Sequence, residues 1–153
     1  MRAIAMVAGL ALVVAACGGE KKTNQAAPPA QEQAAPAPAP AAGTVHEVQM
    51  DFDGKVGAFV PSALTIKAGD IVKFIVRTGP PHNVAFDPKG IPAGAEAFLN
   101  GAMTETMGPL TGPMKVAIGD SYEINFTGAP PGVYNYHCTP HLPFGMKATI
   151  TVQ

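Results

Sequence analysis

The sequence predicts an all-β domain with the architecture of a sandwich, and three observations support this fold class. Apolar residues after residue 43 recur with a period of two instead of the 3.6 of a helix. The apolar runs are short and separated by turn residues, and the 153-residue chain contains 17 Gly and 16 Pro. Roughly seven such runs follow one another, a number typical of a β-sandwich or barrel.

The predicted strands begin near residue 48, where Val48, Met50 and Phe52 alternate with polar residues. Residues 64–67 continue this pattern, and a Gly-Asp turn precedes the next strand. The alternation fails over residues 93–106, so a short helix or an irregular loop is expected there. The other predicted strands are IVKFIVR at 71–77, a short strand after His82 that includes Val84 and Phe86, SYEINF at 121–126, VYNYHC at 133–138 and KATITV at 147–152.

The N-terminus is typical of a secretory signal peptide that covers residues 1–16. A positive start at Arg2 is followed by an uncharged apolar run that ends in VAAC. This ending resembles the lipobox of bacterial lipoproteins, which implies that Cys17 carries lipid and becomes the mature N-terminus. Acyl chains contribute about 0.8 kcal/mol per buried methylene and would hold the protein on a membrane. The alternative is ordinary secretion after cleavage behind Ala16.

Residues 17–43 are predicted to form a disordered tether that starts with the lipidated cysteine. Ala, Pro and Gln dominate this segment, which lacks the large apolar side chains that offset the entropy of ordering a chain. Residues 44–153 are left as the folded domain. The whole chain has 10 Lys and Arg against 11 Asp and Glu, a balance that argues against a nucleic-acid surface.

The strand VYNYHC separates its side chains onto two faces. Tyr134, Tyr136 and Cys138 share one face, and His137 lies on the other. Because two tyrosines accompany the cysteine, we expect Cys138 to point into the domain. His137 should then point outward and should not bind what Cys138 binds.

Three potential metal ligands stand close together in the segment NYHCTPHLPFGM, namely Cys138, His141 and Met146, and His82 in PPHNVAF offers a second imidazole. A thiolate and two imidazoles with a weak thioether form the ligand set of a blue-copper electron-transfer site. Zinc is the main competing metal. Two further alternatives are a buried core cysteine that binds nothing and a Cys-His nucleophile pair.

Three segments resemble, in the same order, cupredoxins of the plastocyanin, pseudoazurin and amicyanin type: VPSALTIKAGDIVKFIV, PPHNVAFDPKGIPAG and GVYNYHCTPHLPFGMKATITV. The resemblance covers residues 44–153 and implies a Greek-key cupredoxin sandwich of about eight strands. It also implies that one type 1 copper ion is bound by His82, Cys138, His141 and Met146.

The resemblance assigns roles to residues around these ligands as well. Asn83 is implied to tie the two ligand loops together, which orients the metal ligands. Leu142, Pro143 and Phe144 are implied to form an apolar patch at which a partner docks. His137 stands where plant plastocyanins place a tyrosine at a remote electron-transfer patch, so the chain departs from the family pattern there.

A protein of this kind is expected to carry single electrons by cycling between Cu(I) and Cu(II), and not to be an enzyme. The lipobox implies an extracytoplasmic, periplasmic protein anchored to a membrane. Gly18 does not suggest retention in the inner membrane, so the outer membrane is favoured. The expected partners are redox proteins such as c-type cytochromes or a respiratory complex in transient contact, and the domain is expected to be a monomer that binds no nucleic acid.

Two other functions remain open, which are periplasmic copper handling by delivery or storage, and service as an accessory module of a larger oxidase or reductase. Copper handling would use Met103, Met107 and Met114 as extra thioether ligands, whereas the ordinary role of methionine is to fill the core. His46, at the start of the first strand, is expected to face solvent without a role.

Overall fold

The computed structural model describes residues 43–153, and the signal peptide, Cys17 and most of the tether, which were predicted from residues 1–42, lie outside this part. Eight strands, one α-helix and one 3-10 helix form the described part of the chain. The elements are β1 (Val45–Phe52), β2 (Gly57–Val60), β3 (Ala63–Ile66), β4 (Ile71–Val76), β5 (Ala85–Phe86), α1 (Ala95–Ala102), β6 (Ser121–Asn125), β7 (Gly132–His137), η1 (Leu142–Phe144) and β8 (Lys147–Val152).

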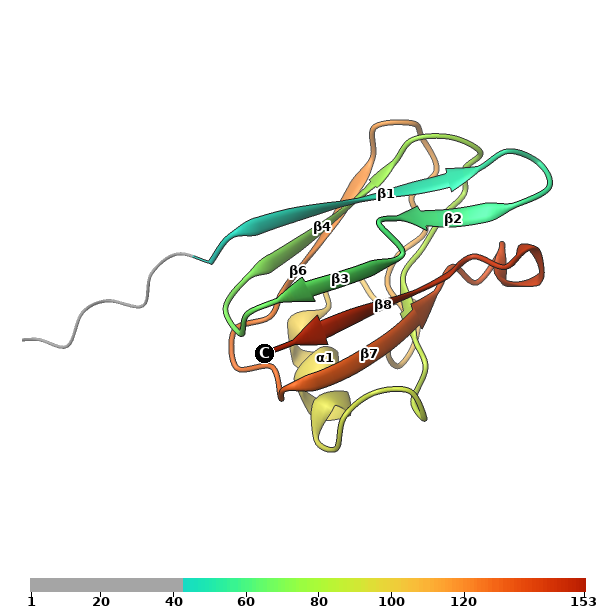
Figure 1. The fold of residues 1–153 in the computed structure, drawn as a ribbon. Helices are drawn as coiled ribbons and strands as arrows, with labels where there is room; N and C mark the ends of the chain where they lie inside the picture. Colours follow the sequence, from blue (N-terminus) through green and yellow to red (C-terminus); the bar gives the residue numbers. More distant parts are fainter. Residues whose placement is uncertain (1–42) are drawn as a thin grey trace, which may run out of the picture. The chain divides into compact units, whose positions relative to one another are not determined.

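The strands form two four-stranded sheets that pack face to face (Figure 1). The first sheet has the order β2-β1-β4-β6, and the second has the order β3-β8-β7-β5. β1 runs parallel to β4 and β3 runs parallel to β8, whereas the other neighbouring strands are antiparallel. The predicted all-β sandwich of eight strands is therefore confirmed.

Alternate residues of the strands point into the space between the sheets, as the period of two predicts. Along β7 and the residue after it, Tyr134, Tyr136 and Cys138 are buried while Val133 and Asn135 are exposed. The face predicted for Cys138 is therefore confirmed. The other strands contribute to this core Val48, Met50, Phe59, Ile66, Val72, Phe74, Val76, Ile124, Ile150 and Val152.

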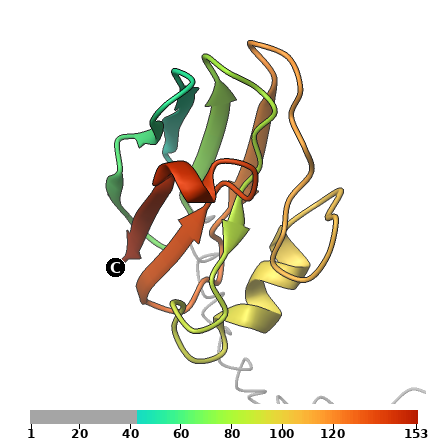
Figure 2. The ribbon, with the colours of Figure 1, turned by 90° about the vertical axis from the view of Figure 1, so that its right-hand side faces the viewer.

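The helix α1 lies within the segment where alternation was expected to fail, and Figure 2 shows it at one side of the sandwich. It buries Ala95 and Leu99 against the core. Met103, directly after the helix, is also buried in the core, whereas Met107 is 60% exposed. Within residues 43–153, no helix has the length and apolar character that crossing a membrane requires.

The start of the domain is fixed to the turn before β4 by Asp70. One carboxylate oxygen of Asp70 accepts the Thr44 amide at 2.9 Å, and the other accepts the Lys67 amide at 2.9 Å. His46 Nε2 lies 2.9 Å from the second oxygen. His46 therefore helps to hold the start of the domain, and the expectation that it has no role is wrong. The pattern of one strand could not predict this contact, because its partner lies 24 residues away in the sequence.

We expect Asp70→Asn to remove part of the acid sensitivity of folding. The hydrogen bond from the Lys67 amide, and then that from His46, lower the pKa of Asp70 from 3.8 to about 2. A lowered pKa stabilises the fold above the unfolded-state value, and this contribution is lost as the pH falls from 3.8 to about 2. The wild type should therefore melt at a higher temperature than the variant above pH 3.8, and this difference should become smaller as the pH falls to about 2. A difference that stays constant with pH would contradict the assignment.

The Tyr136 hydroxyl is buried and has no hydrogen-bond partner among the described residues. Its ring packs in the core against Phe59, Phe74 and Phe86, with ring centroids 4.7, 5.5 and 5.8 Å away. This burial raises the pKa of the phenol. A buried polar group without a partner costs about 1–3 kcal/mol.

Tyr136→Phe should therefore raise the free energy of unfolding, by about 1 kcal/mol, when it is measured by denaturant titration. Tyr134→Phe is the matched control, because the Tyr134 hydroxyl donates to the Pro130 carbonyl at 2.6 Å and its removal should destabilise the fold. A destabilised Tyr136→Phe protein would show that the hydroxyl has a partner after all.

Candidate metal centre

The loop between β7 and β8 holds three of the predicted ligands. Cys138 follows directly after β7, and its amide donates a hydrogen bond to the carbonyl of Met146 at 3.1 Å, which closes the loop. The 3-10 helix η1 begins directly after His141. Gly145 has a φ of +80°, a left-handed conformation that glycine favours, and there the chain turns back toward β8. Figure 2 shows this loop at the end of the sandwich that faces the viewer.

His82 reaches the same place from the segment between β4 and β5. Its backbone pairs with Lys115, with hydrogen bonds of 2.9 and 2.8 Å in the two directions. The His82 Nε2 atom lies 2.8 Å from the Thr78 carbonyl oxygen. Because a carbonyl oxygen only accepts, Nε2 carries the proton and Nδ1 keeps a free lone pair. Thr78 therefore orients His82 for binding a metal through Nδ1.

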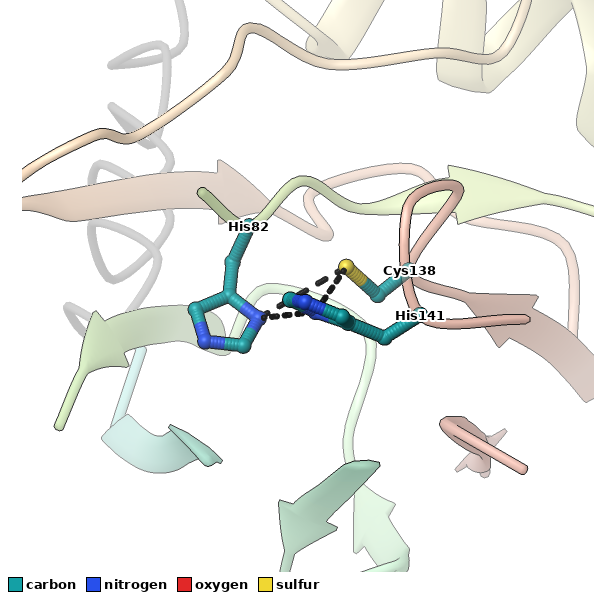
Figure 3. A group of neighbouring side chains, drawn as sticks. All are labelled: His82, Cys138 and His141. Carbon is teal, nitrogen blue, oxygen red and sulfur yellow. Dashed lines mark hydrogen bonds between the residues drawn. The ribbon is translucent and has the colours of Figure 1, made fainter. Parts of the chain in front are cut away.

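Three donor atoms converge on one point, as Figure 3 shows. Cys138 Sγ lies 3.6 Å from His82 Nδ1 and 3.6 Å from His141 Nδ1. The two imidazole nitrogens are 3.2 Å apart. All three side chains are buried. Residues from two distant segments of the sequence are thus brought together with their lone pairs facing one another.

Met146 lies beside Cys138 and His141, with which its backbone is hydrogen-bonded. It is fully buried, and its amide donates to the His141 carbonyl at 3.2 Å. Its thioether is the donor that the sequence predicts as the weak axial ligand. The structure therefore places all four predicted ligands at one end of the sandwich.

Asn83 joins the two segments that carry the ligands. Its carboxamide oxygen accepts the Thr139 amide at 2.8 Å, and its Nδ2 donates to the Thr139 hydroxyl at 3.1 Å. Asn83 is buried, so water does not compete for these bonds. Because Asn83 follows His82 and Thr139 follows Cys138, the pair of bonds holds two ligands at a fixed separation.

The electrostatics of the site favour the uncharged forms of Cys138 and His141 before a metal binds. Burial raises the pKa of the Cys138 thiol, while hydrogen bonds from the backbone amides of Asn83 and His141 act against this rise. Burial also lowers the pKa of His141, and the nearby His82 lowers it further. Neutral imidazoles are the form that binds a metal, and a bound metal favours the thiolate.

The donor atoms fit a metal ion in a trigonal arrangement. Three ligands spaced evenly at about 2.0–2.3 Å from a metal would lie roughly 3.5–4 Å from one another. The observed separations of 3.2 and 3.6 Å are close to this spacing. One thiolate, two imidazoles and a neighbouring thioether suit copper, since structural zinc sites are built from Cys and His alone.

Two residues at the site were not predicted from the sequence. Thr78 acts through its backbone carbonyl, which carries no sequence signal. The ring of Phe52, at the end of β1, stacks on the His141 imidazole with centroids 4.1 Å apart and planes 22° apart. The sequence predicted Phe52 only as one of the alternating apolar residues of the first strand, and nothing in that pattern predicts its contact with His141.

The predicted docking residues lie on the surface of the same end. Leu142 is 37% exposed and Phe144 is 43% exposed, and Pro143 between them is also exposed. His141 itself is only 6% exposed. An apolar surface therefore surrounds the one ligand that retains contact with solvent.

His137 lies apart from the ligands, although it is next to Cys138 in the sequence. It lines a surface groove of ≈ 670 Å³ together with Asp87, Asn135 and Lys147. Burial lowers the pKa of His137, while the charge of Asp87 acts in the opposite direction. The outward direction predicted for His137 therefore agrees with its position in the structure.

Comparison with known proteins gives a consistent result. The profile of the family described as copper binding proteins, plastocyanin/azurin family, matches residues 46–153. Plastocyanin from Scenedesmus fuscus is 40% identical over 113 residues, which cover 69% of this chain and 97% of that protein. Plastocyanin from Prochlorothrix hollandica is 36% identical over 115 residues, which cover 75% of this chain and 78% of that protein. The structure of oxidised plastocyanin from Dryopteris crassirhizoma superimposes with a TM-score of 0.54 at 28% identity, covering 71% of this chain and all of that one.

Proposed function

This chain belongs to the plastocyanin/azurin family of copper-binding proteins, a family of single-electron carriers, and from this premise we propose that it shuttles electrons between redox partners outside the cytoplasm. The observation that carries the proposal is the convergence of Cys138 Sγ, His82 Nδ1 and His141 Nδ1 on one buried point. Copper held there would supply a one-electron couple between Cu(I) and Cu(II).

The protein's own contribution is to hold the ligands in one arrangement. Asn83 fixes the separation of the two ligand segments, and Thr78 fixes the orientation of His82. Ligands that are held by hydrogen bonds move little when the charge of the site changes, which keeps the reorganisation small. His82, Cys138 and Met146 are fully buried, so the donors offer no surface to a substrate, which supports electron transfer without catalysis.

Electrons would enter and leave through His141. We propose that Leu142, Pro143 and Phe144 form the docking surface, because apolar side chains release water readily on contact and suit a short-lived encounter. Redox proteins such as c-type cytochromes or a respiratory complex fit this role. The alternative of copper handling loses one of its three thioethers, because Met103 is part of the core, although Met107 is exposed.

We also propose that the domain is held at a membrane by lipid on Cys17, with residues 1–16 removed as a signal peptide. The support is the sequence pattern, which resembles a lipobox and is followed by an Ala/Pro-rich segment. Replacing Cys17 by serine should move the protein from the membrane fraction to the soluble fraction with its copper spectrum unchanged. Continued membrane association without an acyl group on the mature N-terminus would contradict the anchor.

The function is tested by loading the purified protein with copper. Bonding between Cu(II) and a thiolate should give an intense visible absorption that disappears on reduction and returns on reoxidation. A protein that holds copper only as Cu(I) and exchanges it readily would instead support delivery or storage. Zinc in the purified protein, with no colour after copper is added, would contradict a copper centre.

A further inference from the structure

Gly57 lies against two of the ligands more closely than any other residue type would allow. It is the first residue of β2, and it is not among the glycines with positive φ, so its conformation does not require glycine. A Cβ atom at this position would lie 2.7 Å from Met146 Cβ and 3.1 Å from His141 Cβ. Carbon atoms do not approach to 2.7 Å without displacement. The missing side chain is therefore what lets the backbone of β2 press on Met146 and His141.

Phe52 is the register partner of Gly57 in the neighbouring strand. Residues directly opposite in an antiparallel pair point to the same face of the sheet, so the Phe52 ring and the vacant side of Gly57 lie next to each other. The Phe52 ring lies on the His141 imidazole at 4.1 Å and also contacts Phe144 at 4.9 Å between centroids. Phe52 thus covers the imidazole ring of His141, and Gly57 lies against the Cβ atom of the same histidine.

The backbone of Phe52 is itself held in place. Its amide donates to the Thr78 hydroxyl at 3.1 Å, and this hydroxyl donates to Asp51 Oδ1 at 3.1 Å. Thr78 is also the residue whose carbonyl accepts the proton of His82 Nε2 at 2.8 Å. Phe52 is therefore connected to both histidines, to His141 through its ring and to His82 through Thr78.

We propose that the cross-strand pair of Phe52 and Gly57 is a positioning element for the copper ligands, in which Gly57 sets the place of Met146 and Phe52 sets the ring plane of His141. The inference rests on the proposed copper centre. The weak axial ligand tunes the reduction potential of such a site, so a small displacement of Met146 has a measurable effect. A merely structural role in the β1–β2 hairpin would change stability and leave the metal site as it is.

The test uses the full-length chain with Gly57→Ala and Phe52→Leu, each with a matched control. Gly101→Ala adds the same methyl group in α1, where nothing lies within 4 Å. Phe98→Leu removes an aromatic ring that packs on Phe126, at 5.8 Å between ring centroids. For each protein, the copper hyperfine splitting, the ratio of the visible bands, the reduction potential and the rate of Cu(I) removal by a chelator are measured. Thermal unfolding of the metal-free protein reports stability separately.

We expect Gly57→Ala to shift the band ratio and the reduction potential beyond the range seen with Gly101→Ala. Phe52→Leu should release Cu(I) about ten-fold faster than Phe98→Leu does, the low end of the effect of losing a residue that orients a ligand. If Gly57→Ala does not fold, the inference is tested by the rate of Cu(I) release from Phe52→Leu compared with that from Phe98→Leu. If the wild type shows the blue absorption but Gly57→Ala and Phe52→Leu have the same spectra and release rates as their controls, this inference is overturned and the proposed function is not. A wild type without the thiolate absorption would overturn the proposed function and the inference together.

Discussion

Replacing Cys138 by serine is expected to abolish the intense visible absorption of the copper-loaded protein. The thiolate would be the strongest donor to the metal and would supply the electron density that produces the colour. Cys138 is fully buried and lies 3.6 Å from both imidazole nitrogens, so no other group can replace its sulfur. Copper affinity should fall by more than the 10–100-fold that loss of an outer partner typically costs. Absorption spectroscopy and a competition titration measure the two effects.

The control for this experiment is His137→Ser, which changes the residue next to Cys138 on the opposite face of β7. His137 lies in the surface groove and contributes no atom to the cluster of donors. Its variant should keep the colour and the affinity of the wild type. An intense band that survives in Cys138→Ser would refute the copper-thiolate assignment, and its loss in both variants would point to a general disturbance of β7.

Charges placed on the apolar surface around His141 should slow electron exchange by about ten-fold, which corresponds to about 1.4 kcal/mol of contact free energy. Leu142→Glu and Phe144→Lys introduce opposite charges at two exposed apolar positions. Slower exchange in both variants would therefore report loss of apolar contact and not a change in long-range attraction. The rates to be measured are electron self-exchange between oxidised and reduced copies and exchange with a c-type cytochrome.

Val133→Lys serves as the control for this second experiment. Val133 is an exposed residue near the start of β7, at the opposite end of that strand from Cys138. Its variant adds the same charge as Phe144→Lys and should leave the rates unchanged. Unchanged rates in the Leu142 and Phe144 variants, with spectra close to wild type, would exclude this surface as the route. A slowed Leu142 variant beside an unchanged Phe144 variant would instead point to the groove at His137, which Leu142 also lines.

The sequence was sufficient for those features that depend on neighbours along one strand or one loop. Alternation along residues 133–138 was enough to direct Cys138 inward and His137 outward, and the burial pattern agrees. The ligand types were also visible, because Cys, His and Met have few other reasons to stand together in one loop. These are properties that period and chemistry determine before any tertiary contact is known.

The features that could not be predicted depend on pairing between strands. β2 has four residues and starts at Gly57, so it gave no recognisable strand pattern, and the stacking of Phe52 on His141 follows from the register of β1 with β2. The hydrogen bond of His46 with Asp70 likewise joins the first strand to a distant turn. A glycine without positive φ carries no local signal at all, since only the surrounding atoms show why a side chain is excluded.

The place of β8 in the second sheet has a consequence for the order of events in the cell. Strand β8 lies between β3 and β7 and pairs with both, so the second sheet cannot form until residues 147–152 have been synthesised. Pairing β8 with a strand as far back in the sequence as β3 is slow, because a long loop must close first. His82 and Cys138 are separated by 56 residues and meet only in the finished sandwich. The donor atoms of these two ligands are therefore brought together by the folding of the sandwich and not by neighbours along the chain.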